Sequence, residues 1–123
     1  MGLTYVTVSL KAPGSNAEHY EALFLVDTGA TDSMAPASEL LRAGITRVGR
    51  SSYELADGST IAYDFGLAQI EFLGEITAGR VLFGPEGVAP ILGVTALESI
   101  GVTVDPASQQ LKRLPAIPLK RAS

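Results

Sequence analysis

The chain has 123 residues, of which 46% are hydrophobic and 18% are charged, so it is long enough for one folded domain and is not intrinsically disordered. Its formal net charge is −4, from 9 basic and 13 acidic residues, which argues against a nucleic-acid-binding protein with a basic face. The lack of cysteine excludes disulfides, thiolate metal sites and a cysteine nucleophile.

The first half of the chain predicts strands, turns and one short helix. Residues 3–10 alternate between apolar and polar side chains, which indicates a half-buried strand. Residues 20–26 include a continuous apolar run, which is typical of a strand buried on both faces. Residues 37–43 lie between Pro36 and Gly44, and a proline near the first helical position with a glycine just past the end predicts a short helix.

The second half of the chain predicts mainly hairpins. Within residues 51–65, the dipeptide Asp57-Gly58 is a strong signal for a two-residue hairpin turn. The other expected elements are a hairpin over 67–83 turning near Gly74, a buried strand over 88–93, one or two helical turns over 94–101, and a hairpin over 102–114 turning at Asp105-Pro106. Together with 13 glycines and 7 prolines, this succession of short segments indicates an all-β protein.

The sequence predicts neither a membrane protein nor a metalloprotein. No apolar run approaches the roughly 20 residues that span a bilayer, and residues 1–14 lack the basic start of a signal peptide, so we expect a cytoplasmic protein. The single histidine, His19, lies in a polar stretch and is expected at the surface. It leaves no second imidazole for a metal cluster, and we expect no metal, no cofactor and no nucleic-acid partner.

Asp27 is unusual because it ends a strand that is otherwise apolar, and Thr28 and Gly29 follow it. A carboxylate at the end of a core strand lies near a region of low dielectric, where its charge is costly unless it is hydrogen-bonded. Thr28 can supply a hydroxyl, and Gly29 permits close approach of the backbone. An ordinary turn, in which the same three residues simply end a strand, is the alternative interpretation.

Two segments of the chain resemble each other weakly. Residues 24–30, FLVDTGA, and residues 90–96, PILGVTA, both carry an apolar run toward a glycine, and each precedes a predicted helix. Such a pair in one small β-domain suggests internal pseudo-symmetry.

Over residues 3–114 the chain resembles the retropepsin-like aspartic proteases, the single-domain relatives of retroviral protease. The segments that carry the resemblance are LFLVDTGATDSMAP, LADGST and APILGVTALESIGVTVDPASQQL. The matching catalytic signature consists of Asp27, Thr28, Gly29 and Ala30, and the later hydrophobic-hydrophobic-glycine motif that supports the catalytic loop consists of Ile91, Leu92 and Gly93. The resemblance implies a closed β-barrel or sandwich of short antiparallel strands with one or two short helices, assembled as a two-fold homodimer, with a domain over 1–114 and an extended tail over 115–123.

The activity implied by the resemblance is that of an aspartic endopeptidase acting on polypeptides. In this family two aspartates share one proton and hold the water that attacks the scissile carbonyl. The chain has a single Asp-Thr-Gly, and Asp32 lacks the following glycine, so the second carboxylate must come from another subunit. The resemblance therefore implies a homodimer in which Asp27 of each subunit meets its counterpart on the two-fold axis.

The same resemblance implies that the hairpin at Asp57-Gly58 is a flap over the substrate, although an ordinary surface hairpin is the alternative. The expected substrate-binding residues are Ala30, Asp32, Ala56, Asp57, Gly58, Ser59 and Thr60, with residues 81–85 as further pocket candidates. Two other functions remain open at this point: a non-catalytic peptide-binding or assembly module of the same fold, and a plain β-barrel in which Asp27 caps a turn.

Overall fold

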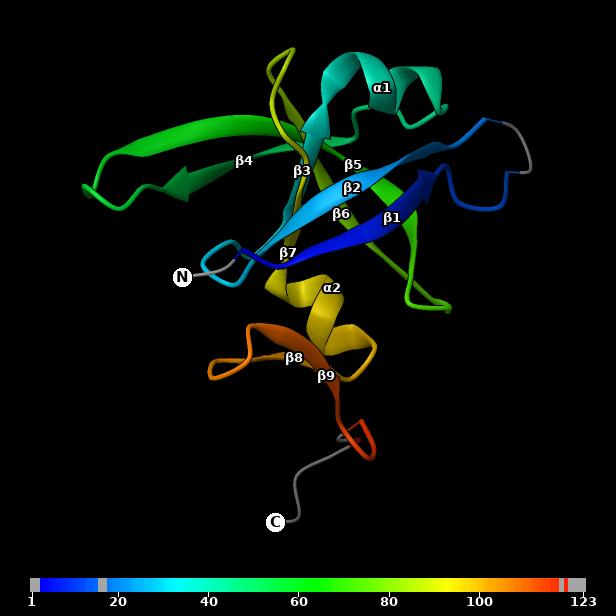
Figure 1. Ribbon diagram of the computed structural model, residues 1–123. Helices are drawn as coiled ribbons and strands as arrows, with labels where there is room; N and C mark the ends of the chain where they lie inside the picture. Colours follow the sequence, from blue (N-terminus) through cyan, green and yellow to red (C-terminus); the bar gives the residue numbers. More distant parts are fainter. Residues whose placement is uncertain (1–2, 16–17, 118, 120–123) are drawn as a thin grey trace.

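The computed structural model describes residues 3–15, 18–117 and 119. Its elements in chain order are β1 (Tyr5–Lys11), β2 (Tyr20–Asp27), β3 (Ser33–Pro36), α1 (Ala37–Arg42), β4 (Gly49–Glu54), β5 (Thr60–Phe72), β6 (Glu75–Gly84), β7 (Ile91–Gly93), α2 (Val94–Ser99), β8 (Val102–Asp105) and β9 (Gln110–Arg113). Nearly all the expected segments appear, and the fold is all-β apart from two helices of six residues each (Figure 1).

Six of the strands close into a barrel. They lie side by side in the order β1-β2-β7-β3-β6-β5, and β1 also pairs with β5, which closes the ring. The strand β4 pairs with β5 outside the ring, so the β4–β5 hairpin projects from the barrel wall, to the left in Figure 1. The strands β8 and β9 form a separate hairpin next to α2. This arrangement confirms the expected closed barrel with short helices.

Two strand pairs differ from the expected antiparallel arrangement. The strand β2 runs parallel to β7, and β3 runs parallel to β6. The sequence pattern identifies a strand but not the direction of a partner that lies 48 residues away for β3 and 66 residues away for β2, because that direction is set by how the barrel closes. The strand β5, with 13 residues, is also longer than expected, and β3 was not expected as a strand at all.

The expectation that residues 20–26 are buried on both faces is wrong. Phe24 is fully buried in the barrel, whereas its neighbour Leu23 is 59% exposed. In the wall of a single barrel, successive side chains point alternately into the core and out of it. In contrast, the predicted alternation of β1 is confirmed, because Val6, Val8 and Leu10 are buried.

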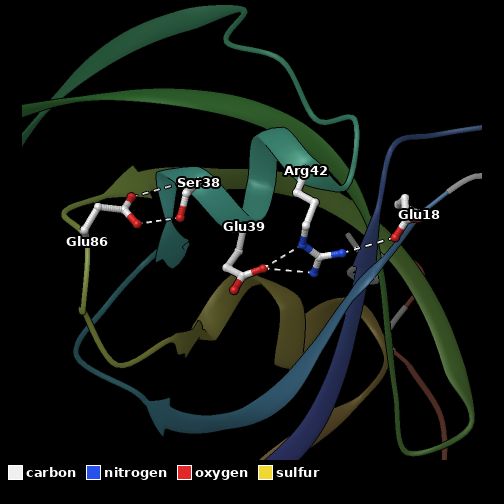
Figure 2. Close-up of polar contacts among 5 residues, drawn as sticks. All are labelled: Glu18, Ser38, Glu39, Arg42 and Glu86. Carbon is white, nitrogen blue, oxygen red and sulfur yellow. Dashed lines mark hydrogen bonds and ion pairs between the residues drawn. The ribbon is translucent and has the colours of Figure 1, made fainter.

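The helices cover the barrel ends. Leu40 of α1 and Leu97 of α2 are both buried in the core. Figure 2 shows how α1 is fastened: Ser38 donates from its backbone N–H and its hydroxyl to Glu86, and Arg42 bonds to Glu39 and Glu18. These contacts are exposed, so they orient the helix more than they stabilise it. Across the described ranges, no helix is long and apolar enough to cross a lipid bilayer.

The two long hairpins use different turns. Between β5 and β6, Leu73 and Gly74 both have positive φ, 54° and 76°, which gives a two-residue turn at the expected position near Gly74. Between β4 and β5, the N–H of Leu55 donates to the carbonyl of Ser59 and that of Gly58 to the carbonyl of Leu55. Leu55 and Ser59 therefore flank a three-residue loop, not the expected two-residue turn. In this loop Gly58 has a φ of 86°, whereas Asp57 keeps an ordinary turn conformation.

Candidate active site

Asp27 is the last residue of β2, and a tight turn follows it. The N–H of Ala30 donates to the carbonyl of Asp27 at 3.1 Å, and the N–H of Gly29 donates to the Asp27 carboxylate at 3.0 Å. As a residue Asp27 is half-buried, while Thr28 and Gly29 are exposed, and the bond from Gly29 to the carboxylate is exposed. The turn therefore supplies a backbone hydrogen bond to the Asp27 carboxylate, which lies at the end of an apolar strand.

The loop over residues 28–32 is fixed to β7 and the start of α2. The N–H of Val94 donates to the carbonyl of Ala30 at 2.8 Å, and that of Thr95 donates to the carbonyl of Thr31 at 3.2 Å. The buried hydroxyl of Ser33 accepts a bond from the N–H of Gly93 at 3.0 Å. These bonds hold the loop on both sides of Asp32.

Gly93 lies where the loop and β7 come into direct contact. A Cβ at this position would lie 2.6 Å from the carbonyl carbon of Asp32 and 2.7 Å from the backbone oxygens of Thr31 and Asp32. No side chain fits there without moving the loop. Ile91 and Leu92 precede it in β7, and Leu92 is fully buried. The segment over 91–93 thus lies directly behind the loop, where the sequence placed it.

The two weakly similar segments of the sequence are neighbours in the barrel. In the parallel pair of β2 with β7, Leu25 lies opposite Ile91, and Asp27 lies opposite Gly93. This register is the one that aligns FLVDTGA with PILGVTA residue by residue. The similarity therefore corresponds to two adjacent strands that leave the barrel side by side.

A groove of about 530 Å³ lies between this loop and the β4–β5 hairpin. The residues that line it are Gly29, Ala30, Thr31, Asp32, Met34, Tyr53, Glu54, Leu55, Ala56, Ile61, Tyr63, Leu82 and Ile91. It brings together Ala30, Asp32 and Ala56 from the expected binding residues. The hairpin tip over 57–60 is exposed and does not line it.

Tyr53 is a residue of the groove that the sequence analysis missed. Its hydroxyl donates to the Asp32 carboxylate at 2.7 Å, and its ring lies 6.4 Å from that of Tyr63. Burial raises the pKa of Tyr53, and the bond to Asp32 raises this pKa further, so the hydroxyl stays protonated and donates. The available signal was the alternation of β4, in which Tyr53 shares the less exposed face with Ser51.

Comparison with known proteins places the chain in a family. A family model described as aspartyl protease matches residues 12–96, a span that includes Asp27, the β4–β5 hairpin and Gly93. The chain belongs to this aspartyl protease family. A search of curated proteins found no match.

In this member of the aspartyl protease family, the loop after Asp27 has a second hollow on another side. This hollow has a volume of about 460 Å³ and lies between α2 and the β8–β9 hairpin. Its lining residues are Thr28, Val94, Leu97, Glu98, Val102, Thr103, Val104, Leu114 and Ile117. Thr28 thus contributes to this hollow, whereas Gly29 and the residues up to Asp32 contribute to the groove.

Proposed function

We propose that this chain is an aspartic endopeptidase whose active site is completed by a second copy of the chain. The observation that supports this proposal is the position of Asp27, a half-buried residue at the end of β2, directly before a braced loop that lines a groove, in a chain of the aspartyl protease family. The chain has one Asp-Thr-Gly, and a shared proton requires two carboxylates. Each subunit therefore supplies one Asp27.

In the proposed reaction, the two Asp27 carboxylates share one proton and hold a water molecule. One carboxylate accepts a proton from this water as the water oxygen attacks the scissile carbonyl carbon. The other, protonated, carboxylate donates a hydrogen bond to the carbonyl oxygen, where negative charge develops. The bond from Gly29 N–H orients Asp27, and the close contact at Gly93 fixes the loop, so little reorganisation accompanies the attack.

The proposed dimer places the hollow beside Thr28 at the two-fold axis. The lining of the hollow is largely apolar, and Leu114 and Ile117 are 42% and 54% exposed. Apolar surface of this kind is stabilised when a second copy covers it. The β8–β9 hairpin at its edge is tied to the barrel, because the Thr4 hydroxyl donates to the carbonyl of Gln109. Thr28 of each subunit would bond across the axis.

The β4–β5 hairpin is proposed to cover a bound polypeptide as a flap, with residues 57–60 as its tip. The catalytic domain is proposed to span residues 1–114, since Leu114 N–H still bonds to the carbonyl of Gly101. Residues 115–123 are proposed as an extended tail. Residues 1–2, 16–17, 118 and 120–123 of these two ranges lie outside the described part.

The decisive test is Asp27→Asn, which is nearly isosteric but cannot accept the proton from water. Peptide cleavage should fall to background, while circular dichroism and the folding midpoint stay close to those of the parent. The measurement is cleavage of a peptide library by both proteins at equal concentration. An Asp27→Asn protein that cleaves as fast as the parent would show that the aspartic mechanism is wrong. A parent that binds peptides without cleaving them would instead indicate a binding module.

A further inference from the structure

The groove beside the Asp27 loop combines an apolar wall with a negative charge. Apolar side chains from several elements line it, among them Met34, Ile61 and Leu82. Of the described residues in its lining, two are acidic, Asp32 and Glu54, and none is basic. A groove with apolar side chains and carboxylates in its lining matches a side chain with an aliphatic stem and a cationic head.

Asp32 is held in position to accept further hydrogen bonds. Tyr53 donates to one of its carboxylate oxygens, Oδ2. A carboxylate has about four lone-pair sites, so this bond orients the group and leaves the other oxygen for a ligand. Within the described part of the chain, Asp32 forms no ion pair.

One candidate for an internal counter-charge is Arg80, which lines a small adjoining crevice together with Asp32. Its guanidinium donates to the Ser51 hydroxyl at 2.9 Å and lies 4.0 Å from the centre of the Phe65 ring. These contacts hold Arg80 against the β4–β5 hairpin, outside the groove lining. It weakens the negative potential at Asp32 without occupying the carboxylate.

We propose that the groove selects polypeptides with a lysine or arginine side chain at one position near the scissile bond, and that the Asp32 carboxylate receives its cationic head. This inference rests on the proposed function, because it assigns the groove to the substrate. Glu54 is exposed, and its carboxylate adds a second, weaker attraction for the cationic head of the substrate side chain. Tyr53 acts as a positioning residue for Asp32.

The experiment has a cleavage arm and a binding arm, both with the full chain. In the first arm, the parent digests a peptide library, and the residues around each cut are counted. In the second arm, Asp27→Asn protein binds a positional library of decapeptides in which one position is lysine, arginine or norleucine and the others are random. Norleucine keeps the aliphatic stem of lysine without its charge.

We expect lysine and arginine to exceed norleucine about tenfold at one position in both arms, as for a hydrogen-bonded charge pair. Asp32→Asn should reduce this preference to less than about twofold, while Asp32→Glu should retain part of it. Tyr53→Phe should give an intermediate preference. Glu21→Gln removes an exposed acidic charge outside the groove lining and should leave the preference unchanged.

Each outcome decides between the two proposals. Cleavage without a lysine or arginine preference, or a preference that survives Asp32→Asn, overturns the inference and leaves proteolysis standing. An Asp32-dependent preference in the binding arm without any cleavage by the parent overturns the protease, and with it the position near a scissile bond, and supports the contact of Asp32 with the cationic head. If neither arm shows a preference for lysine or arginine, the assignment of the groove to a cationic side chain of the substrate is overturned. Circular dichroism shows whether each variant is folded. If Asp32→Asn is not folded, Asp32→Glu and Tyr53→Phe are compared with the parent, and an undiminished preference in both overturns the inference.

Discussion

Gly93 shows how a single residue governs the position of a functional loop. It lies opposite Asp27 in the parallel strand pair, and the backbone of Thr31 and Asp32 occupies the space that a Cβ would need. The N–H of Gly93 is bonded to the buried Ser33 hydroxyl, so the contact does not separate without breaking a buried hydrogen bond. The geometry of the loop therefore depends on the lack of a side chain at this position.

We expect Gly93→Ala to destabilise the protein by about 1–3 kcal/mol, because the added methyl group collides with backbone atoms that cannot turn away. Cleavage should fall as well, since the loop that carries Asp27 must shift. Urea unfolding and initial rates measure the two effects. Gly79→Ala is the matched control: its Cβ would lie 3.9 Å from Ile70 Cδ1, an ordinary contact, and it should change stability by less than about 0.5 kcal/mol. Equal stability of the two variants would contradict the close contact.

At the scale of the element, the β4–β5 hairpin projects from the barrel wall, and different interactions hold its strands and its tip. Along its strands, Tyr53 bonds to Asp32, and Arg80 bonds to Ser51. At the tip, the Asp57 carboxylate accepts bonds from the hydroxyl and the N–H of Ser59. The tip interactions are local to the turn, so they shape it independently of the barrel.

The turn at the tip should respond to pH in a predictable direction. The hydroxyl and the N–H of Ser59 lower the pKa of Asp57 below its ordinary value of 3.8. Because the pKa of Asp57 is lower in the folded state, its charged carboxylate stabilises the fold at pH values above the pKa of the unfolded chain. This stabilisation is lost as the pH falls through the pKa of the folded state. Ser59→Ala should raise the pKa of Asp57 toward 3.8, because it removes the side-chain hydrogen bond from Ser59, which is the largest cause of the lowered pKa. Carboxyl carbon chemical shifts followed by NMR between about pH 2 and 6 measure it.

The control for this titration is Asp105, whose pKa is lowered in a similar way by the N–H of Ala107 in another loop. The pKa of Asp105 should be the same in the parent and in Ser59→Ala. If the pKa of Asp57 also stays the same, the turn at the hairpin tip is not held by Ser59.

At the scale of the whole molecule, the loop after Asp27 lies between two hollows with different proposed roles. The groove under the β4–β5 hairpin is assigned to substrate, and the hollow between α2 and the β8–β9 hairpin to a second subunit. Thr28 lines one and Gly29 lines the other, so one short loop connects catalysis with assembly. Under this assignment a monomer has half an active site.

Mixing the parent with Asp27→Asn protein tests this assembly. At a one-to-one ratio with free exchange, about half of all dimers are mixed and about a quarter are fully parental. The mixed dimers have one carboxylate, so activity per parental chain should fall to about half. The measurement is initial rate against Asp27→Asn fraction at a fixed parental concentration above the dissociation constant. Dilution below that constant should also lower activity per chain.

Sedimentation velocity on the same samples is the control for subunit exchange and oligomeric state. A rate that does not depend on the Asp27→Asn fraction, measured on samples that do exchange subunits, would contradict the shared site. A catalytically active monomer would also contradict the shared active site.

Local patterns in the sequence determined most elements of this protein and its candidate catalytic residue. The alternation of β1, the turn at Gly74, the helix after Pro36 and the position of Asp27 at a strand end all depend on neighbours in the chain, so they were predicted. The motif over 27–30 and the motif over 91–93 together indicated the family that the comparison found.

Barrel closure decided what depends on residues far apart in the chain. It set the parallel pairing of β2 with β7, formed β3 as a strand between β7 and β6, and left Leu23 outside the core. It also brought Tyr53 to Asp32 across 21 residues; the alternation of β4 indicates the less exposed face of Tyr53 but not this partner. The physical reason is that turn chemistry and side-chain alternation act over a few residues, whereas strand direction and groove lining follow from which distant surfaces bury one another.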